Sequence, residues 1–202
     1  MASETRRAVL TLPVVYVVWF FAFQVNVLDF WTRLTIAASI LLVTALAVGR
    51  KGMSVKPTPK AVAVGLVSAV LLYLFFWSGY QVLKGFPQFT ATISSVYSLK
   101  AAEPVSVIAA VLLFPIGPTE EVYWRGLIQR GLSQRLSTRS SILLTSALYG
   151  SIHIPTLNPS LIFTAFVGGL VWGYVYKRWG LAASMVSHTL WDEMIFVFFV
   201  IS

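Results

Sequence analysis

The sequence contains no cysteine and very little charge. Its 202 residues include 7 acidic residues and 2 histidines. The absence of cysteine excludes a thiol nucleophile, a disulfide framework and a thiolate metal site. With 57% hydrophobic residues, 11% charged residues and a mean hydropathy of +0.80, the chain is far more apolar than a soluble domain. The composition therefore indicates an integral membrane protein.

Long stretches without Asp, Glu, Lys or Arg divide the chain into candidate spans. These stretches are residues 8–28, 34–49, 61–83, 104–119, 140–176 and 179–191. A helix needs about 20 residues to cross a hydrocarbon core of about 30 Å. The stretch 140–176 is too long for one helix, and Pro155, Asn158 and Pro159 divide it. Counting the last span through Ile201, we predict an all-α, polytopic transmembrane bundle of about seven spans.

We expect residues 1–202 to form a single integral membrane domain. Residues 1–103 hold three N-terminal spans and a long connection over 84–103, which has room for a re-entrant or amphipathic segment. The first apolar run extends to Leu28 without a small-residue cleavage site, so it is interpreted as a retained span and not a signal peptide. Residues 104–202 form the expected catalytic core.

The net charge of +8 does not indicate nucleic acid as a partner, because the basic residues lie between apolar runs. Every second connection is basic, and short basic loops are typical of the cytoplasmic side. The sequence therefore predicts a multi-pass cell-membrane protein with a cytoplasmic N-terminus and a C-terminus on the far side. These basic residues are Arg6, Arg7, Arg50, Lys51, Lys56, Lys60, Arg130, Arg135, Arg139, Lys177 and Arg178.

Ionisable side chains within a span are costly unless they face the bundle interior and find a partner, so they indicate function. The first such group is Glu120, Glu121 and Arg125. Glu121 and Arg125 are four residues apart on one helix face and can pair, which leaves Glu120 to project into a cavity. Upstream, Pro115 and Pro118 each remove a backbone donor and are expected to break the helix beside the glutamates.

Two further pairs are also spaced by four, Tyr149 with His153 and His188 with Asp192. A carboxylate in a low-dielectric bundle with an imidazole nearby can activate water, so Glu120 with His153 is the candidate pair. His188 is the candidate donor to a developing oxyanion. Asp192 can donate only if it is protonated, and otherwise it orients His188 or holds a cation.

Taken together, Glu-Glu-x-x-x-Arg at 120–125, aromatic-x-x-x-His at 149–153 and His-x-x-x-Asp at 188–192 resemble the CAAX prenyl protease and bacteriocin-processing family, also called the Abi family. The resemblance implies a prokaryotic, glutamate-type intramembrane endopeptidase. It implies that Glu120 and His153 activate water and that His188 and Asp192 form the oxyanion site, with Glu121 and Arg125 in support.

Two positions depart from the usual pattern of that family. The aromatic residue of the second motif is usually Phe and is Tyr149 here, which adds a hydroxyl. The last position is Asn in the eukaryotic prenyl proteases and is Asp192 here, as in many prokaryotic members. The resemblance requires no metal or other cofactor. A divalent ion on the two histidines and the acidic residues is the alternative, although the zinc-protease pattern His-Glu-x-x-His is absent.

A non-catalytic membrane immunity protein and a proton-coupled transporter are the alternatives to a protease, because buried Glu, His and Asp also build proton relays. Within the protease interpretation, the partners are membrane lipids and a peptide or lipidated protein substrate. A prenylated C-terminal tail, a bacteriocin leader peptide and a C-terminal sorting helix all suit a cavity among apolar helices.

Overall fold

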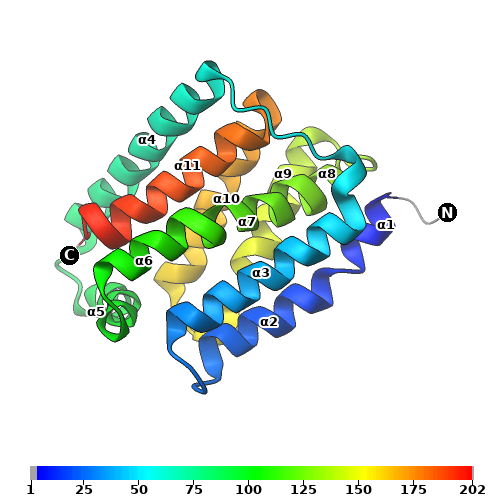
Figure 1. Ribbon diagram of the computed structural model, residues 1–202. Helices are drawn as coiled ribbons and strands as arrows, with labels where there is room; N and C mark the ends of the chain where they lie inside the picture. The colour runs from blue at the N-terminus through cyan, green and yellow to red at the C-terminus, as the bar shows by residue number, and fades with distance from the viewer. Residues whose placement is uncertain (1–3, 202) are drawn as a thin grey trace.

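A computed structural model describes residues 4–201, which form helices and connections without a β-strand (Figure 1). The predicted all-α class is confirmed. The α-helices are α1 (Glu4–Val9), α2 (Leu12–Gln24), α3 (Phe30–Gly49), α4 (Pro59–Leu83), α5 (Pro87–Tyr97), α6 (Val105–Val111), α7 (Gly117–Glu121), α8 (Arg130–Leu132), α9 (Thr138–Ser151), α10 (Pro159–Trp179) and α11 (Leu181–Glu193). Shorter 3₁₀ and π segments include η3 (Leu112–Ile116), η4 (Val122–Gln129), η5 (Ile154–Thr156) and η6 (Met194–Phe198).

Five helical segments are long and apolar enough to cross a membrane, which makes the chain a multi-pass membrane protein. They are Glu4–Gln24, Phe30–Gly49, Pro59–Leu83, Val105–Leu132 and Pro159–Trp179. The other two predicted spans correspond to α9 and α11, which are shorter, with 14 and 13 residues. The bundle therefore combines five full-length spans with two shorter helices, the second of which continues into η6.

The helix that carries the two glutamates is interrupted where the prolines predict it. Phe114 has extended backbone angles (φ −161°, ψ 125°) inside η3, directly before Pro115. Pro118 lies in the first turn of α7, where a missing backbone N–H costs little. The interruption lets α7 begin at Gly117 and places Glu120 and Glu121 within its short length.

Local capping sets two of the helix starts at one end of the bundle. The Asn158 side chain accepts a hydrogen bond from the Leu161 backbone N–H at 3.0 Å and begins α10. Asp29 caps α3 by accepting from the Thr32 backbone N–H at 2.8 Å. Hydrogen bonds from the side chain and the backbone of Thr32 hold the pKa of Asp29 below its usual value.

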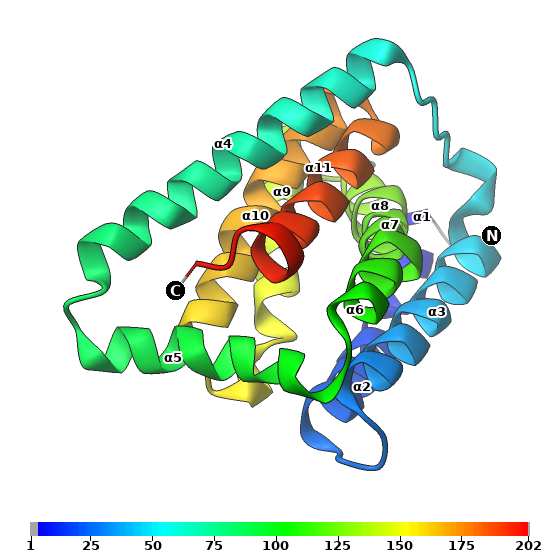
Figure 2. The ribbon, with the colours of Figure 1, turned by 60° about the vertical axis from the view of Figure 1, so that its left-hand side comes forward.

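The two ends of the bundle differ in charge. At one end, here called the basic end, α8 lies beside α1, and Arg130 pairs with Glu4 and donates to the Gly49 carbonyl at 2.9 Å. At the other, charge-poor end, Gln24 donates to the Pro155 carbonyl at 2.7 Å. Figure 2 shows α5 running across the charge-poor end, past the start of α10. The basic connections of the sequence therefore gather at one end.

Candidate active site

The first motif separates its two glutamates. Both are buried, with 5% of Glu120 and none of Glu121 exposed. Glu121 Oε1 accepts from Arg125 Nη1 at 2.8 Å, the pairing that the spacing of four predicts. Glu120 instead lines a large cavity. The two adjacent carboxylates therefore have different surroundings.

Arg125 connects the first motif to α10. Its side chain is fully buried, and Nη2 donates to the Gly169 carbonyl at 3.1 Å. The guanidinium carbon also lies 5.4 Å from the ring centroid of Tyr149 and 5.5 Å from that of Trp172. A planar cation beside two aromatic rings gains cation–π attraction in a desolvated site. Arg125 thus anchors the Glu121 carboxylate in a fixed place.

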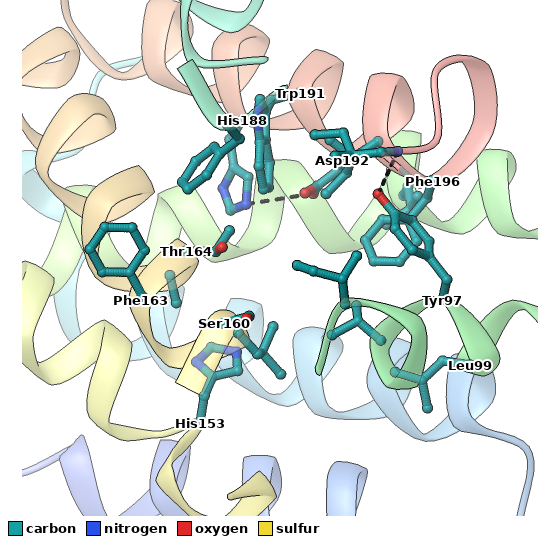
Figure 3. Close-up of a pocket in the computed structure, with 18 of the residues that line it drawn as sticks. Tyr97, Leu99, His153, Ser160, Phe163, Thr164, His188, Trp191, Asp192 and Phe196 are labelled. Carbon is teal, nitrogen blue, oxygen red and sulfur yellow. Dashed lines mark hydrogen bonds and ion pairs between the residues drawn. The ribbon is translucent and has the colours of Figure 1, made fainter. Parts of the chain in front are cut away.

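His188 is held on three sides. Its Nδ1 lies 2.9 Å from Glu121 Oε1, and its Nε2 lies 3.5 Å from Asp192 Oδ2. Its ring stacks on Trp172, with centroids 3.7 Å apart and planes 19° apart. Because a carboxylate paired with Arg125 accepts hydrogen bonds, Nδ1 of His188 is the donor. The remaining nitrogen, Nε2, faces Asp192, as Figure 3 shows.

Tyr149 joins the second motif to the first. Its hydroxyl donates to Glu120 Oε2 at 2.7 Å. Its backbone carbonyl accepts from His153 Nδ1 at 3.0 Å. Glu120 and His153 are therefore tied to the same residue, while among the described residues no hydrogen bond joins them directly. The hydroxyl that distinguishes Tyr149 from Phe contacts the candidate base itself.

His153 follows the end of α9 and presents its second nitrogen to α2. Since a carbonyl oxygen only accepts, Nδ1 carries the proton and Nε2 of a neutral His153 has a free lone pair. Trp19 Nε1 donates to this Nε2 at 3.4 Å. Phe23 packs edge-on against the ring at 5.5 Å. The first span, beyond the three motifs, thus contributes to the surroundings of the site.

All four residues that the sequence predicts as catalytic, Glu120, His153, His188 and Asp192, line one cavity of about 560 Å³. Figure 3 shows His153 across this space from His188 and Asp192, with Thr164 between them. The rest of the lining is mostly apolar and aromatic and comes from α2, α3, α4, α5, α10 and α11. Burial raises the pKa of Tyr97, on α5, to about 12, so its hydroxyl stays protonated and accepts from the Ile201 N–H at 3.1 Å.

Sequence reasoning did not single out three contributors to this arrangement. These are the hydroxyl of Tyr149 as a donor to Glu120, the Trp172 ring beneath His188, and the Trp19 indole beside His153. Tryptophan in a membrane span is commonly a packing residue or an interface anchor, so its presence alone does not indicate an active site. The sequence offered a signal for the first of the three contributors, because Tyr149 stands where the resembled family usually has Phe.

Over residues 4–201, no three His, Asp or Glu side chains converge in a way that could hold a metal ion. His188 uses Nδ1 for Glu121, and His153 uses Nδ1 for the Tyr149 carbonyl. The second nitrogen of each ring lies at longer distance from its neighbour, with His153 Nε2 3.4 Å from Trp19 Nε1 and His188 Nε2 3.5 Å from Asp192 Oδ2.

The fold and the cavity define a multi-pass membrane protein with paired carboxylates and imidazoles inside the bundle. Residues 101–194 match the Rce1-like family, described as type II CAAX prenyl endopeptidase Rce1-like, so this segment is similar to that family. The matched segment contains all three motifs. The description of that family names an endopeptidase, which is a hydrolase. Neither the curated proteins nor the solved structures contain a match to this chain.

Proposed function

We propose that this protein hydrolyses a peptide bond of a membrane-associated substrate, with Glu120 as the general base. The observation that carries the proposal is the hydrogen bond from Tyr149 to Glu120 at the edge of a cavity that His153, His188 and Asp192 also line. These groups have the chemistry that water activation and oxyanion stabilisation need.

The first step is activation of water. Tyr149 holds Oε2 of Glu120, which leaves Oε1 to accept a proton from a water molecule. His153 Nε2, the unprotonated nitrogen of the ring, exchanges its 3.4 Å contact with Trp19 Nε1 for a hydrogen bond from the same water and orients it. The resulting hydroxide attacks the carbonyl carbon of the substrate. A fixed carboxylate is a better base than a mobile one because no reorganisation is required as the proton moves.

The second step is stabilisation of the tetrahedral intermediate. The oxyanion lies beside His188 Nε2, which donates to it when the ring carries both protons. Glu121 and Asp192 flank this ring on its two nitrogens and balance its positive charge. Trp172 fixes its plane. We therefore assign Glu121, Arg125 and Trp172 the role of positioning residues for His188.

The third step is breakdown of the intermediate. The C–N bond breaks as Glu120 returns its proton to the leaving nitrogen, which yields a new carboxylic acid and a new amine, and the acid proton then passes to the amine. One water molecule is consumed, and Glu120 ends ionised as it began. The four residues and water suffice for this sequence, so we propose that it proceeds without a metal ion.

The lining of the cavity suits an apolar substrate segment. Aromatic side chains such as Phe76, Phe89 and Trp191 surround the space between the catalytic residues and α5. A lipidated tail or an apolar peptide segment would exchange contacts with lipid chains for packing against these side chains, which leaves no polar group unpaired. We propose that the substrate is a peptide or lipidated protein of this kind.

The decisive experiment compares the wild-type protein with Glu120→Gln by mass spectrometry of membrane peptides incubated with each purified protein. We expect new peptide termini with the wild type and their loss with Glu120→Gln. The matched control is Glu193→Gln, which neutralises another buried carboxylate, outside the cavity lining, and should leave the termini unchanged. Equal cleavage by Glu120→Gln, or the absence of wild-type cleavage, would contradict the proposal.

A further inference from the structure

The charge asymmetry of the bundle indicates which end faces the cytoplasm. The basic end holds Arg6, Arg7, Lys51, Lys56, Lys60, Arg130, Arg135, Arg139, Lys177 and Arg178, with Glu4 as its acidic residue. The charge-poor end holds Arg33, Lys84 and Lys100 with Asp29 and Glu103. Because Lys and Arg accumulate in short cytoplasmic loops, the charge-poor end is expected to face away from the cytoplasm.

The cavity lies toward the charge-poor end. Its lining from α3 is Phe30, Trp31 and Leu34, the first turns after the charge-poor connection. Its lining from α4 lies in the last turns, from Phe75 to Leu83. The amphipathic α5 crosses this end, where Asn158 Nδ2 donates to the Thr92 carbonyl at 2.8 Å.

The mouth of the cavity is marked by exposed apolar side chains on α4 and α10. Phe75 and Phe163 are each 55% exposed, and Leu83 is 40% exposed. All three line the cavity. An exposed aromatic rim at membrane depth admits an apolar segment laterally from the bilayer.

Between Glu120 and the basic end, the bundle is filled by packed side chains. Tyr123, Trp124 and Leu127 follow Glu120 along the same helical segment toward Arg130 at the basic end. None of these three side chains is exposed. Packed side chains therefore separate the catalytic glutamate from the basic end, while a cavity connects it to the charge-poor end.

From these observations we infer that the active site receives its substrate from the non-cytoplasmic half of the membrane. The substrate class is then an apolar or lipid-anchored peptide segment presented on the non-cytoplasmic leaflet, and not a lipidated tail on the cytoplasmic surface. This inference rests on the proposed function for the identity of the reaction. The direction of access itself can be tested without turnover.

The chain has no cysteine, so single-cysteine variants report access cleanly. The cavity reporter is Thr164→Cys, between His153 and His188 in Figure 3, made in the Glu120→Gln background so that no cleavage is needed. Ser54→Cys marks the basic end and Gln88→Cys the charge-poor end, since both residues are exposed. Ile36→Cys is the matched control, because Ile36 is 47% exposed and faces away from the cavity at a similar distance from that end.

Each variant is treated with a charged, membrane-impermeant thiol reagent in intact bacterial cells and in inverted membrane vesicles. We expect Thr164→Cys to be labelled in intact cells together with Gln88→Cys, and Ser54→Cys only in inverted vesicles. Ile36→Cys should stay unlabelled in both, because a charged reagent does not enter hydrocarbon. Ser160→Cys, one turn nearer the mouth, serves as the second cavity reporter should Thr164→Cys fail to fold.

Labelling of both cavity reporters only in inverted vesicles, or in neither preparation, would overturn the inference. So would labelling of Ser54→Cys in intact cells, since the orientation would then be reversed. Correct labelling together with no cleavage of any membrane peptide would reject the proposed protease and leave the access route standing. The two failures are therefore distinguishable.

Discussion

The hydroxyl of Tyr149 donates a hydrogen bond to Oε2 of Glu120 at 2.7 Å. The carbonyl of the same tyrosine accepts from His153 Nδ1 at 3.0 Å. One residue therefore sets the position of both groups that we assign to water activation. A phenylalanine at this place would keep the backbone contact to His153 and lose the contact to the carboxylate.

Replacing Tyr149 with Phe is expected to lower kcat about tenfold and to change KM much less. A hydrogen bond to a charged group contributes about 1.5–3 kcal/mol, and part of it is lost when the freed carboxylate finds water instead. The loss falls on kcat because the hydroxyl fixes the base and does not bind the substrate. Steady-state kinetics on a peptide identified by mass spectrometry would measure both constants.

The matched control is Tyr123→Phe. Tyr123 is also fully buried, and its hydroxyl contacts Thr11 at 3.0 Å, outside the cavity lining. This variant should lower stability by about 1 kcal/mol and leave kcat unchanged. If Tyr123→Phe and Tyr149→Phe reduced kcat equally, the effect would be one of general packing, and the positioning role of Tyr149 would be rejected.

The two adjacent glutamates should respond differently to loss of charge. In Glu121→Gln, Arg125 is left without its counter-charge at 0% exposure, a change that costs about 3–5 kcal/mol in buried pairs. In Glu120→Gln, the amide oxygen can still accept from Tyr149, so stability is expected to stay close to that of the wild type. Thermal unfolding of the purified proteins would measure this difference.

A double variant tests whether the loss of stability in Glu121→Gln comes from the unpaired charge of Arg125. The double variant Glu121→Gln with Arg125→Met removes both charges and should recover most of the stability, because an apolar side chain can replace a buried ion pair. It should not recover activity, since His188 would lack the carboxylate at Nδ1. Equal melting temperatures for Glu120→Gln and Glu121→Gln would contradict this division of roles.

Chelation is expected to leave activity unchanged. The described residues offer no set of three metal-ligating side chains, and each imidazole already uses Nδ1. Incubation with EDTA or 1,10-phenanthroline, followed by the cleavage assay, tests this directly. Loss of cleavage that returns on adding a divalent ion, with one bound metal per chain by elemental analysis, would show that a metal takes part.

Close packing of α4 on α11 depends on Gly65. A Cβ at this position would lie 2.7 Å from Val186 Cβ and 2.8 Å from the Ala183 carbonyl oxygen, which is backbone and cannot turn aside. We expect Gly65→Ala to destabilise the protein by about 1–3 kcal/mol through overpacking. Gly79→Ala on the same helix is the control, since a Cβ there meets nothing within 4 Å. Similar melting temperatures for the two variants would refute this account.

Much of the site could be predicted from the sequence because it depends on local geometry. The spacing of four predicts the pairing of Glu121 with Arg125 and brings His188 to 3.5 Å from Asp192. Pro115 marks the interruption before the glutamates, and the composition shows that the helices lie in a membrane. These inferences need only the repeat of a helix and the cost of charge in lipid.

The tertiary structure decided how the motifs meet. His188 bonds Glu121 across 67 positions, Tyr149 bonds Glu120 across 29 positions, and Trp19 reaches His153 across 134 positions. The helical repeat relates residues one turn apart and says nothing about which faces of different helices touch. Those contacts depend on the packing of whole helices, including the close approach at Gly65 and the course of α5. The sequence by itself therefore determined the membrane class and which residues are the candidates for the chemistry, and the packing decided which residues hold them and toward which end the cavity lies.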